Sequence, residues 1–539
     1  MNGIEAVAEI LRLEKVPFVA CEGAAPIPDY CADVGLRIIN CRQERVAVDI
    51  AHGYARVSQN PGVCSMMGTG GIENSFAGVA HAWEDLAPIL VLPGGISRLR
   101  KGNRDFEAVN SYLRVTKWAQ SINFTDRVPE MMRRAFTYLK CGRPGPVLLE
   151  LLGELRGEEL SSPLEYQPVK AWKPAGNPHD VEVVVKALLA AKNPLIYVGT
   201  GVYRAKAEEE LKTFVELIQR PVITTMNAKG AFPENHALSV GFIRGEPTEH
   251  FLGKADLVFG IGASFNRHFT ALMVPAGKKI IQTACIDEFD INREYPVDHA
   301  VIGDAKLVLT QMIAEVKKQA GEKRENSELK KEIADAKEKH LKNWMQWLTS
   351  DEKPINPYRV MWDLMHTINR DKSIVTHDAG NPRDQLSSFW ETTVPHGYIG
   401  WGHVTTLGFG LGAAIGAALA LPDRLSINFI GDASIGQVGM DFETPVRTKI
   451  PMMTIILNNG QYGGYDRYHR HEETYKVTGD YTKVAEGLGA HSERIEEPDE
   501  VIPAIKRGMK TVDAGGYAVL EMMTSNFPKF PSFAGYPPR

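Results

Sequence analysis

Short apolar segments alternate with longer helix-like segments along the whole chain, and this alternation limits the fold more than any other feature. Short apolar strands separated by helices of about ten or more residues are typical of parallel sheets covered on both faces. We therefore expect an α/β fold of three consecutive doubly wound parallel-sheet domains. The apolar runs predict strands at residues 18–20, 37–39, 63–67, 88–95, 146–151, 194–199, 221–225, 257–262, 279–281, 373–376, 425–430, 453–457 and 518–522.

The length of 539 residues is too great for a single hydrophobic core. A proline-rich stretch at residues 162–178 interrupts the strand pattern and predicts a linker. Residues 321–342 are dense in Lys and Glu and predict a charged surface helix or connector. We expect a first domain, a central domain, a charged connector and a last domain with a C-terminal tail, at residues 1–165, 178–320, 321–354 and 355–539.

Charge and apolar content exclude several classes of protein. The net charge of −5 argues against nucleic-acid binding, which needs a basic surface. No uninterrupted apolar run of about 20 residues is present, so we expect no membrane segment; residues 407–421 come closest, and their Gly and Ala content suits an interior helix. The six cysteines form no CxxC pair, and no basic region precedes an apolar one at the N-terminus. We expect a reduced, cytoplasmic protein.

Polar residues follow two neighbouring strands of the last domain. The sequence Gly431-Asp432-Ala433-Ser434 comes after one strand, and Asn458-Asn459 ends the next. The carboxyl ends of parallel strands are where open α/β sheets bind ligands. A carboxylate, an amide oxygen, a backbone carbonyl and phosphate oxygens suit an octahedral Mg²⁺ ion. The alternative is a turn aspartate followed by a capping asparagine pair.

This spacing resembles the magnesium–diphosphate motif of thiamine diphosphate enzymes, in which GDG is followed one strand later by NN. The resemblance implies that Asp432, Asn459 and the main chain of Gln461 hold Mg²⁺. It also implies that the diphosphate of thiamine diphosphate lies against Gly431, Ala433 and Ser434. Ala433 departs from the family pattern, which has Gly at that place.

A segment near the N-terminus resembles a second motif of this family. Residues 42–47 and 53–56 are similar to the pattern RHEQ…A…GYAR, which places Glu44 on the catalytic glutamate. Such a carboxylate lies beside the aminopyrimidine ring of the cofactor, where it promotes removal of the thiazolium proton. Without the flanking motif, Glu44 is typical of a surface residue at a helix start.

Two segments of the last domain carry further resemblances. Residues 402–410 are similar to the loop GGLGTMGFG, which implies that Leu407 wedges between the two cofactor rings. The carbonyl of Thr405 then accepts a hydrogen bond from the pyrimidine amino group. Residues 378–381 are similar to DVGQ, with Asn381 in the place of a diphosphate-contacting glutamine.

The resemblance extends over the whole chain, in the order pyrimidine-binding, central and diphosphate-binding domain. It implies a homodimer or homotetramer in which Glu44 of one chain serves the diphosphate domain of another. We expect an acetolactate-synthase-like 2-oxo acid decarboxylase or carboligase that requires thiamine diphosphate and Mg²⁺. FAD or ADP in the central domain stays open, although no sequence feature indicates either.

The substrate is less constrained than the cofactor. Residues 68–74 and 142–147 are similar to acetolactate synthases, whereas residues 439–444 and 458–460 are similar to oxalyl-CoA decarboxylase and 2-hydroxyacyl-CoA lyase. An enzyme acting on acyl-CoA-type substrates is therefore the alternative. Polar residues that other branches use on substrate are absent at Ala24, Met67 and Gly95.

Two alternative functions fit the sequence less well, and two further segments are candidates for a role at the active site. A non-catalytic cofactor-binding relative would not need Glu44, and an NAD-linked dehydrogenase would need a complete GxGxxG, of which residues 199–204 hold only the first two glycines. Tyr465, His469 and His471 follow the metal motif, and a histidine there is a candidate proton relay or part of a solvated loop. The tail at residues 524–539 is a candidate lid or a docked end.

Overall fold

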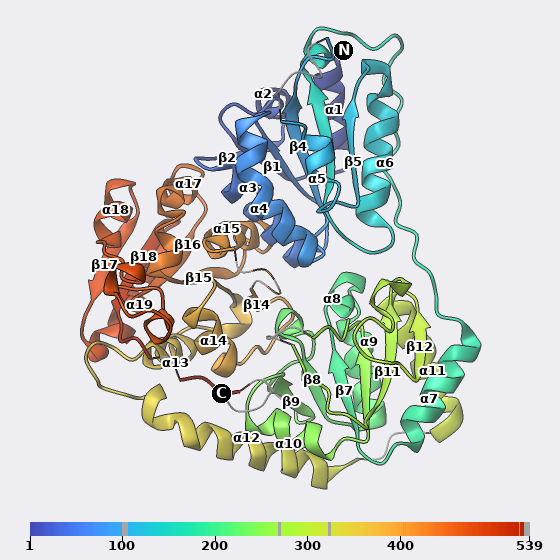
Figure 1. The fold of residues 1–539 in the computed structure, drawn as a ribbon, viewed down its shortest axis with the longest axis vertical. Coiled ribbons are helices and arrows are strands. Elements are labelled where there is room, and N and C mark those ends of the chain that lie inside the picture. Colours follow the sequence, from blue (N-terminus) through green and yellow to red (C-terminus); the bar gives the residue numbers. More distant parts are fainter. Residues whose placement is uncertain are drawn as a thin grey trace.

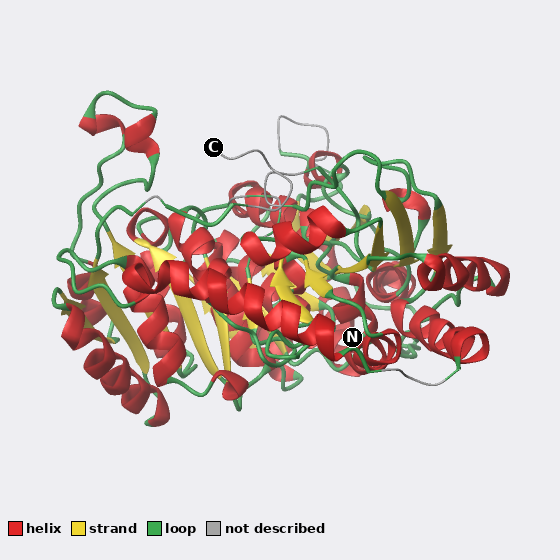
Figure 2. Cartoon of the chain, turned by 90° about the horizontal axis from the view of Figure 1, so that it is seen from below, coloured by secondary structure: helices red, strands yellow, loops and turns green. Residues whose placement is uncertain are grey.

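The structure, a computed structural model, describes residues 1–99, 106–267, 271–321, 325–400, 402, 404, 406–527 and 529–532. These residues form three α/β units in chain order, each built on a six-stranded parallel sheet (Figure 1). Helices lie on both sides of the strands, as Figure 2 shows. The predicted fold of three consecutive parallel-sheet domains is confirmed.

The N-terminal sheet has the strand order β2-β1-β3-β4-β6-β5. Its first helix starts with a capping box, because the Asn2 side chain accepts from the Glu5 N–H and the Glu5 carboxylate accepts from the Asn2 N–H. The strands are β1 (Phe18–Glu22), β2 (Arg37–Cys41), β3 (Gly62–Met66), β4 (Ile89–Gly95), β5 (Trp118–Ile122) and β6 (Val147–Leu152). The helices are α1 (Gly3–Leu13), α2 (Pro28–Asp33), α3 (Glu44–Ser58), α4 (Gly70–Glu84), α5 (Ala108–Tyr112) and α6 (Val128–Lys140).

The central sheet has a different strand order, β12-β11-β10-β7-β8-β9. The chain reaches it through residues 161–177, which contain neither helix nor strand, as the proline-rich composition predicts. Its strands are β7 (Pro194–Val198), β8 (Val222–Thr224), β9 (Ser239–Phe242), β10 (Leu257–Ile261), β11 (Lys279–Cys285) and β12 (His299–Ile302). Its helices are α7 (Pro178–Ala190), α8 (Gly201–Ala205), α9 (Glu208–Ile218), α10 (Glu246–Lys254) and α11 (Ala305–Ala320).

The C-terminal sheet has the order β14-β13-β15-β16-β18-β17. Its strands are β13 (Ser373–His377), β14 (Tyr398–Ile399), β15 (Leu425–Gly431), β16 (Met452–Asn458), β17 (His491–Ile495) and β18 (Tyr517–Met523). Its helices are α13 (Pro357–Thr367), α14 (Asn381–Phe389), α15 (Phe409–Ala420), α16 (Asp432–Ile435), α17 (Glu443–Arg447), α18 (Tyr481–Gly487) and α19 (Val501–Asp513).

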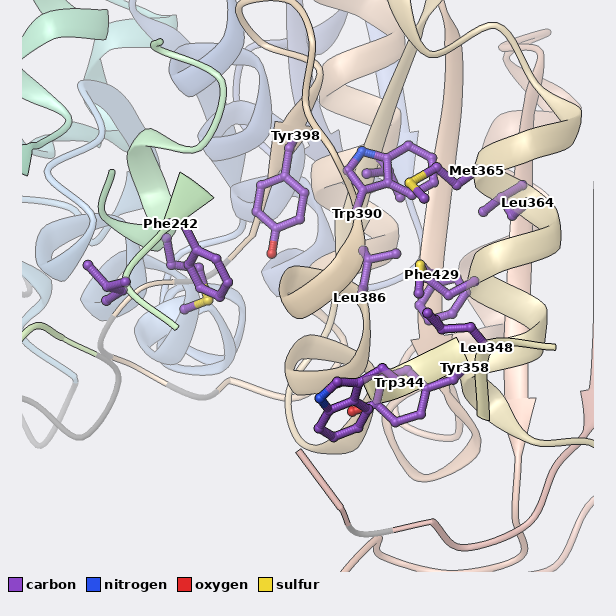
Figure 3. Packing of buried hydrophobic residues seen from close by; sticks show 14 of the residues in the cluster. Phe242, Trp344, Leu348, Tyr358, Leu364, Met365, Leu386, Trp390, Tyr398 and Phe429 are labelled. Atoms are coloured by element: carbon purple, nitrogen blue, oxygen red, sulfur yellow. The ribbon is translucent and has the colours of Figure 1, made fainter. Parts of the chain in front are cut away.

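The charged connector forms a long helix, α12 (Ser327–Leu348). Its polar side faces solvent, as the composition predicts, but its last turns carry apolar side chains into a core. Trp344 and Leu348 are buried there beside Tyr358 of α13 and residues of the C-terminal domain (Figure 3). The same cluster includes Phe242 of the central domain. The connector therefore fastens the central domain to the C-terminal domain by apolar burial.

Helices α3 and α15 join the N-terminal and C-terminal domains (Figure 1). Helix α15 is almost entirely buried, which confirms the interior helix predicted for the Gly/Ala-rich segment. A Cβ atom on Gly416 would lie 2.3 Å from the Ile50 carbonyl oxygen, and one on Gly53 would lie 2.5 Å from the Ala413 carbonyl oxygen. The two backbones can approach so closely only because these positions lack side chains.

No helix in the described ranges is long and apolar enough to cross a membrane. All six cysteines are free thiols, and five of them are buried.

Candidate active site

A cavity of about 250 Å³ lies at the carboxyl edge of the C-terminal sheet. It brings together most of the residues that the sequence predicts for the cofactor and the metal. Those that line it are Asn381, Leu407, Gly431, Asp432, Ala433, Ser434, Asn459 and Gln461. Thr405 lies outside the described residues.

Asp432 ties the ends of two neighbouring strands together. It is the first residue of α16, directly after β15, and one carboxylate oxygen accepts from the Ala433 N–H at 2.9 Å. The other accepts from the Gly460 N–H, beyond β16, at 2.8 Å. Burial raises the pKa of Asp432 to about 6, although these hydrogen bonds act in the opposite direction. A buried carboxylate at this edge gains from a cation beside it.

Asn459 and Gln461 stand beside Asp432 in a tight turn. The Asn459 side-chain oxygen accepts from the Gln461 N–H at 3.2 Å. A carboxylate, an amide oxygen and main-chain groups are therefore within one turn of each other, and they form the hard oxygen donor set that Mg²⁺ prefers. Gln385 adds a buried side-chain oxygen on the cavity wall that has no hydrogen-bond partner in the described structure. The donor set fits Mg²⁺, and the Gln385 oxygen, which can only accept, suits a cation or a hydrogen-bond donor in the cavity.

Asp378 places the loop that carries Leu407, a role that the sequence alone does not assign. This carboxylate is fully buried and accepts from the N–H groups of Ala379 at 2.7 Å, Gly408 at 3.1 Å and Gly410 at 2.8 Å. Gly408 has a φ of 97°, which L side chains rarely adopt. The sequence places Asp378 at the start of the DVGQ-like segment, directly after a buried strand, but does not indicate that its carboxylate holds this loop.

The tail and the loop after the metal motif form other parts of the cavity wall. Thr524, Ser525, Tyr462 and Tyr465 line it. The described part of the tail is docked, because the Phe527 carbonyl accepts from the Gln385 side chain and the Ser532 carbonyl accepts from the Gly245 N–H. Tyr465 is half exposed, and His469 and His471 are exposed on the same loop.

Glu44 stands apart from this cavity. It is the first residue of α3, it is partly exposed, and it accepts a hydrogen bond from the Asn74 side chain at 2.5 Å. A Cβ on Gly71 would lie 3.4 Å from a carboxylate oxygen of Glu44, so Gly71 leaves room beside it. Within one chain, the structure brings the metal and diphosphate residues together but leaves Glu44 out of the residues that line their cavity.

A second, larger cavity of about 550 Å³ lies where the central domain meets the N-terminal domain. Counted from its first strand, the central sheet has the order 3-2-1-4-5-6, which is typical of dinucleotide-binding sheets. Gly199 directly follows its first strand and Gly201 begins α8, and both pack against the backbone of Gly262. The missing side chains of these two glycines are therefore explained by contact with the protein's own backbone. Arg143 and Arg204 supply positive charge to the wall.

Comparison with known proteins identifies the three domains. Family models match residues 1–117 as "Thiamine pyrophosphate enzyme, N-terminal TPP binding domain", residues 181–312 as the central domain and residues 378–522 as the "C-terminal TPP binding domain". Thiamine pyrophosphate is another name for thiamine diphosphate.

Similar proteins cover nearly the whole chain. A probable acetolactate synthase large subunit from Methanococcus aeolicus is 30% identical over 94% of this chain and 90% of its own length. A glyoxylate carboligase from Escherichia coli O157:H7 is 29% identical over the same shares. The crystal structure of benzoylformate decarboxylase from Polynucleobacter necessarius has the same fold, with a TM-score of 0.82 at 20% identity over 98% of this chain and 99% of that one. The chain therefore belongs to the thiamine pyrophosphate enzymes, and it is a thiamine diphosphate-dependent enzyme of the acetolactate synthase-like group of carboligases and decarboxylases.

Proposed function

We propose that this enzyme removes CO₂ from a small 2-oxo acid. The remaining acyl fragment, which keeps the electron pair of the broken bond, is then joined to a second carbonyl compound. The observation that carries the proposal is the cavity whose wall brings together Leu407, Asp432 and Asn459, which come from three separate motifs of the chain. The near full-length similarity to a probable acetolactate synthase and a glyoxylate carboligase supports the same reaction class.

Each residue has a definite task in this proposal. When bound, thiamine diphosphate supplies the electron sink that bond cleavage next to a carbonyl needs. Asp432, Asn459 and the main chain of Gln461 hold Mg²⁺. The diphosphate is bound by Asn381, Gly431, Ala433 and Ser434. Leu407 orients the rings, and its loop is fixed by the Asp378 carboxylate. Glu44 moves the proton at the pyrimidine nitrogen.

The proposed active site needs two chains, because Glu44 does not line the cavity of its own chain. We propose a homodimer at least, with a homotetramer as the fuller assembly, in which Glu44 of one subunit reaches the cavity of its neighbour.

We also propose a location in the cytoplasm, because the six free thiols suit a reducing compartment.

Subunit complementation tests this arrangement. Glu44→Gln and Asp432→Ala each inactivate a homodimer, but a mixed dimer holds one site with both changes and one site with neither. Random mixing of the two variants should restore about a quarter of wild-type activity. Mixtures that stay as inactive as the separate variants would show that both residues act within one chain.

The substrate test compares two classes of compound. Purified enzyme with Mg²⁺ and thiamine diphosphate is offered pyruvate, glyoxylate and longer 2-oxo acids, and separately oxalyl-CoA and a 2-hydroxyacyl-CoA. We expect CO₂ release and a carboligation product from the 2-oxo acids. Turnover of the CoA thioesters alone would favour the alternative function, which residues 439–444 and 458–460 resemble.

The second cavity supports a second candidate ligand. We propose that it holds an adenine-containing nucleotide such as FAD or ADP, because its sheet order and its arginines suit a diphosphate-bearing ligand. A visible absorption spectrum of the purified protein distinguishes a flavin from ADP. Denatured protein that releases no nucleotide, and native protein that binds neither FAD nor ADP in calorimetry, would contradict this assignment.

A further inference from the structure

Four side chains of the N-terminal domain form a charged cluster that the proposed reaction does not use. His52 and Arg56 lie on α3, His81 lies on α4, and Asp85 directly follows α4. The side chains of His52, His81 and Asp85 are completely buried, and that of Arg56 is 10% exposed. One Asp85 oxygen lies 2.8 Å from Arg56 Nη1 and 3.4 and 3.3 Å from the Nε2 atoms of His52 and His81.

Two residues of this cluster form hydrogen bonds with the start of the loop that leads to Leu407. Arg56 donates to the carbonyl oxygen of Gly400, and the second Asp85 oxygen accepts from the Gly402 N–H at 3.1 Å. A Cβ on Gly402 would lie 2.5 Å from this Asp85 oxygen, so the loop backbone lies directly against the carboxylate. The backbone at this point is therefore fixed by side chains of another domain.

The two histidines of the cluster contact the end of that loop. Phe409 is the first residue of α15, and its ring lies 4.8 Å from the His52 ring and 4.4 Å from the His81 ring, centroid to centroid. Leu407 thus lies between two contacts, Gly402 before it and Phe409 after it, that both depend on His52, Arg56, His81 and Asp85. We call these four residues the interdomain clamp.

Asp85 and Arg56 balance each other's charge inside the clamp. Burial alone would raise the pKa of Asp85, but the Arg56 guanidinium and the two imidazoles hold it well below its usual value. Burial lowers the pKa of His52 to about 3, so this imidazole is neutral. The ionised Asp85 and Arg56 therefore form one buried pair, with the neutral His52 imidazole beside it.

The spacing of His52, His81 and Asp85 also resembles a metal site. Ligands of a tetrahedral zinc ion lie about 3.3 Å apart, because each bond is about 2.0–2.1 Å long, and the two nitrogen–oxygen separations here are similar. A divalent ion would, however, add two positive charges to a group whose single carboxylate already faces Arg56. Buried charge without compensation is strongly unfavourable, which favours the clamp over a zinc site.

We propose that the interdomain clamp is a positioning device that holds Gly400, Gly402 and Phe409, and with them Leu407, where they receive the ring end of thiamine diphosphate. This inference rests on the proposed function, in which Leu407 orients the cofactor rings. The clamp does not reach the magnesium–diphosphate residues, because those are held by their own turn between Asp432 and Gly460. Its loss should therefore weaken binding of the rings but not of the diphosphate.

Asp85→Asn tests the proposal in the full-length enzyme. Calorimetry with Mg²⁺ compares two probes, thiamine diphosphate and inorganic pyrophosphate. We expect the Kd for thiamine diphosphate to rise at least tenfold and the Kd for pyrophosphate to change less than twofold. The matched control is Glu14→Gln, which breaks the pair of the buried Glu14 carboxylate with Lys140 inside the N-terminal domain. It should lower the melting temperature without changing either Kd.

Three results would overturn the clamp. The first is an unchanged thiamine diphosphate affinity in Asp85→Asn, and the second is an equal loss of affinity for both probes. The third is one equivalent of zinc in the purified wild-type protein that His81→Gln removes. If Asp85→Asn does not fold, Arg56→Lys carries the same expectations, because it keeps the charge but cannot reach both Asp85 and Gly400. A wild-type protein that binds neither probe would instead contradict the proposed function.

Discussion

The N-terminal and C-terminal domains share one topology and differ at their carboxyl edges. In both sheets the first strand lies between the second and third, and the sixth lies between the fourth and fifth. The C-terminal edge carries a cavity with the oxygen donors of Asp432 and Asn459. The N-terminal edge carries Glu44, which meets Asn74 and Gly71. Topology therefore fixes where a ligand can be bound, whereas the residues at the strand ends give the two edges different chemical groups.

Removing the metal ligand should produce the largest effect on the C-terminal edge. Asp432→Ala removes the charged donor of the proposed site, and even a change to an outer partner of a metal ligand costs about 10–100-fold. We expect thiamine diphosphate affinity in the presence of Mg²⁺ to fall at least about 100-fold, measured by calorimetry. Asp441→Asn is the control, since Asp441 is a buried carboxylate of the same domain that does not line the cavity. Undiminished binding in Asp432→Ala would remove the metal assignment.

Glu44→Gln should leave cofactor binding intact and slow the chemistry. The change keeps the volume and the contact with Asn74 but removes the negative charge that favours the protonated pyrimidine. General acid–base groups contribute about 10²–10⁴-fold, and we expect turnover to fall by that factor. Exchange of the thiazolium proton with deuterated water, followed by NMR, measures the step directly. The exposed Glu73, on the next helix, provides the control Glu73→Gln. Equal exchange rates in wild type and Glu44→Gln would mean that Glu44 does not promote proton removal, and that the two edges do not differ in function as proposed.

Acid should destabilise both domains in the same pH range. Burial lowers the pKa of His52 in the N-terminal domain and of His377 in the C-terminal domain to about 3 each. An unfolded histidine titrates near 6.5, so the unfolded state binds more protons between about pH 3 and 6.5. Stability should therefore fall as the pH drops below about 6.5, by up to about 1.4 kcal/mol per pH unit for each histidine.

Chemical denaturation at several pH values checks this slope. His52→Gln and His377→Gln should each flatten it, and by similar amounts if the two domains are equally closed to water. The exposed His469→Gln serves as the control and should leave it unchanged. A slope that neither buried substitution alters would contradict the assignment.

The contact between the two domains should be sensitive to a single methyl group. Gly416→Ala places a Cβ against the backbone of Ile50 and Tyr54, and overpacking of this kind typically costs about 1–3 kcal/mol. Gly487→Ala is the matched control, because a Cβ at this helical glycine meets nothing within 4 Å. We expect thermal unfolding to move down for Gly416→Ala and to stay or move up for Gly487→Ala. Equal melting temperatures would show that α3 and α15 can separate without cost.

The sequence predicts the inner strands of all three sheets but not five of the strands at their edges. The five missed strands are β5, β9, β12, β14 and β17, and each lies at the end of its sheet. Inner strands are apolar on both faces and appear as apolar runs, whereas β17 is buried at only one of its five positions. Edge strands of this kind are set by pairing with a neighbour, which leaves little local pattern.

The same distinction applies to the candidate site. Asp432, Asn459 and Gln461 lie in short motifs and were predicted from them, and the cavity brings them together. Asp378 and Asp85 act on the backbone of residues distant in the sequence, and Asp85 alone looks like an ordinary aspartate after a helix. Positioning residues of this kind become visible only when the chain is folded.

The contact of α3 with α15 is also internally symmetric. Gly53 meets Ala413, and Ile50 meets Gly416, so each contact is repeated when Gly53 is matched with Gly416 and Ile50 with Ala413. This repetition is the pattern of an approximate two-fold axis within a single polypeptide, and it is what duplication of an ancestral self-associating domain would leave behind. The same matching pairs Glu44 with Leu407. Equivalent positions of the two domains thus hold an acid in one and an apolar residue in the other.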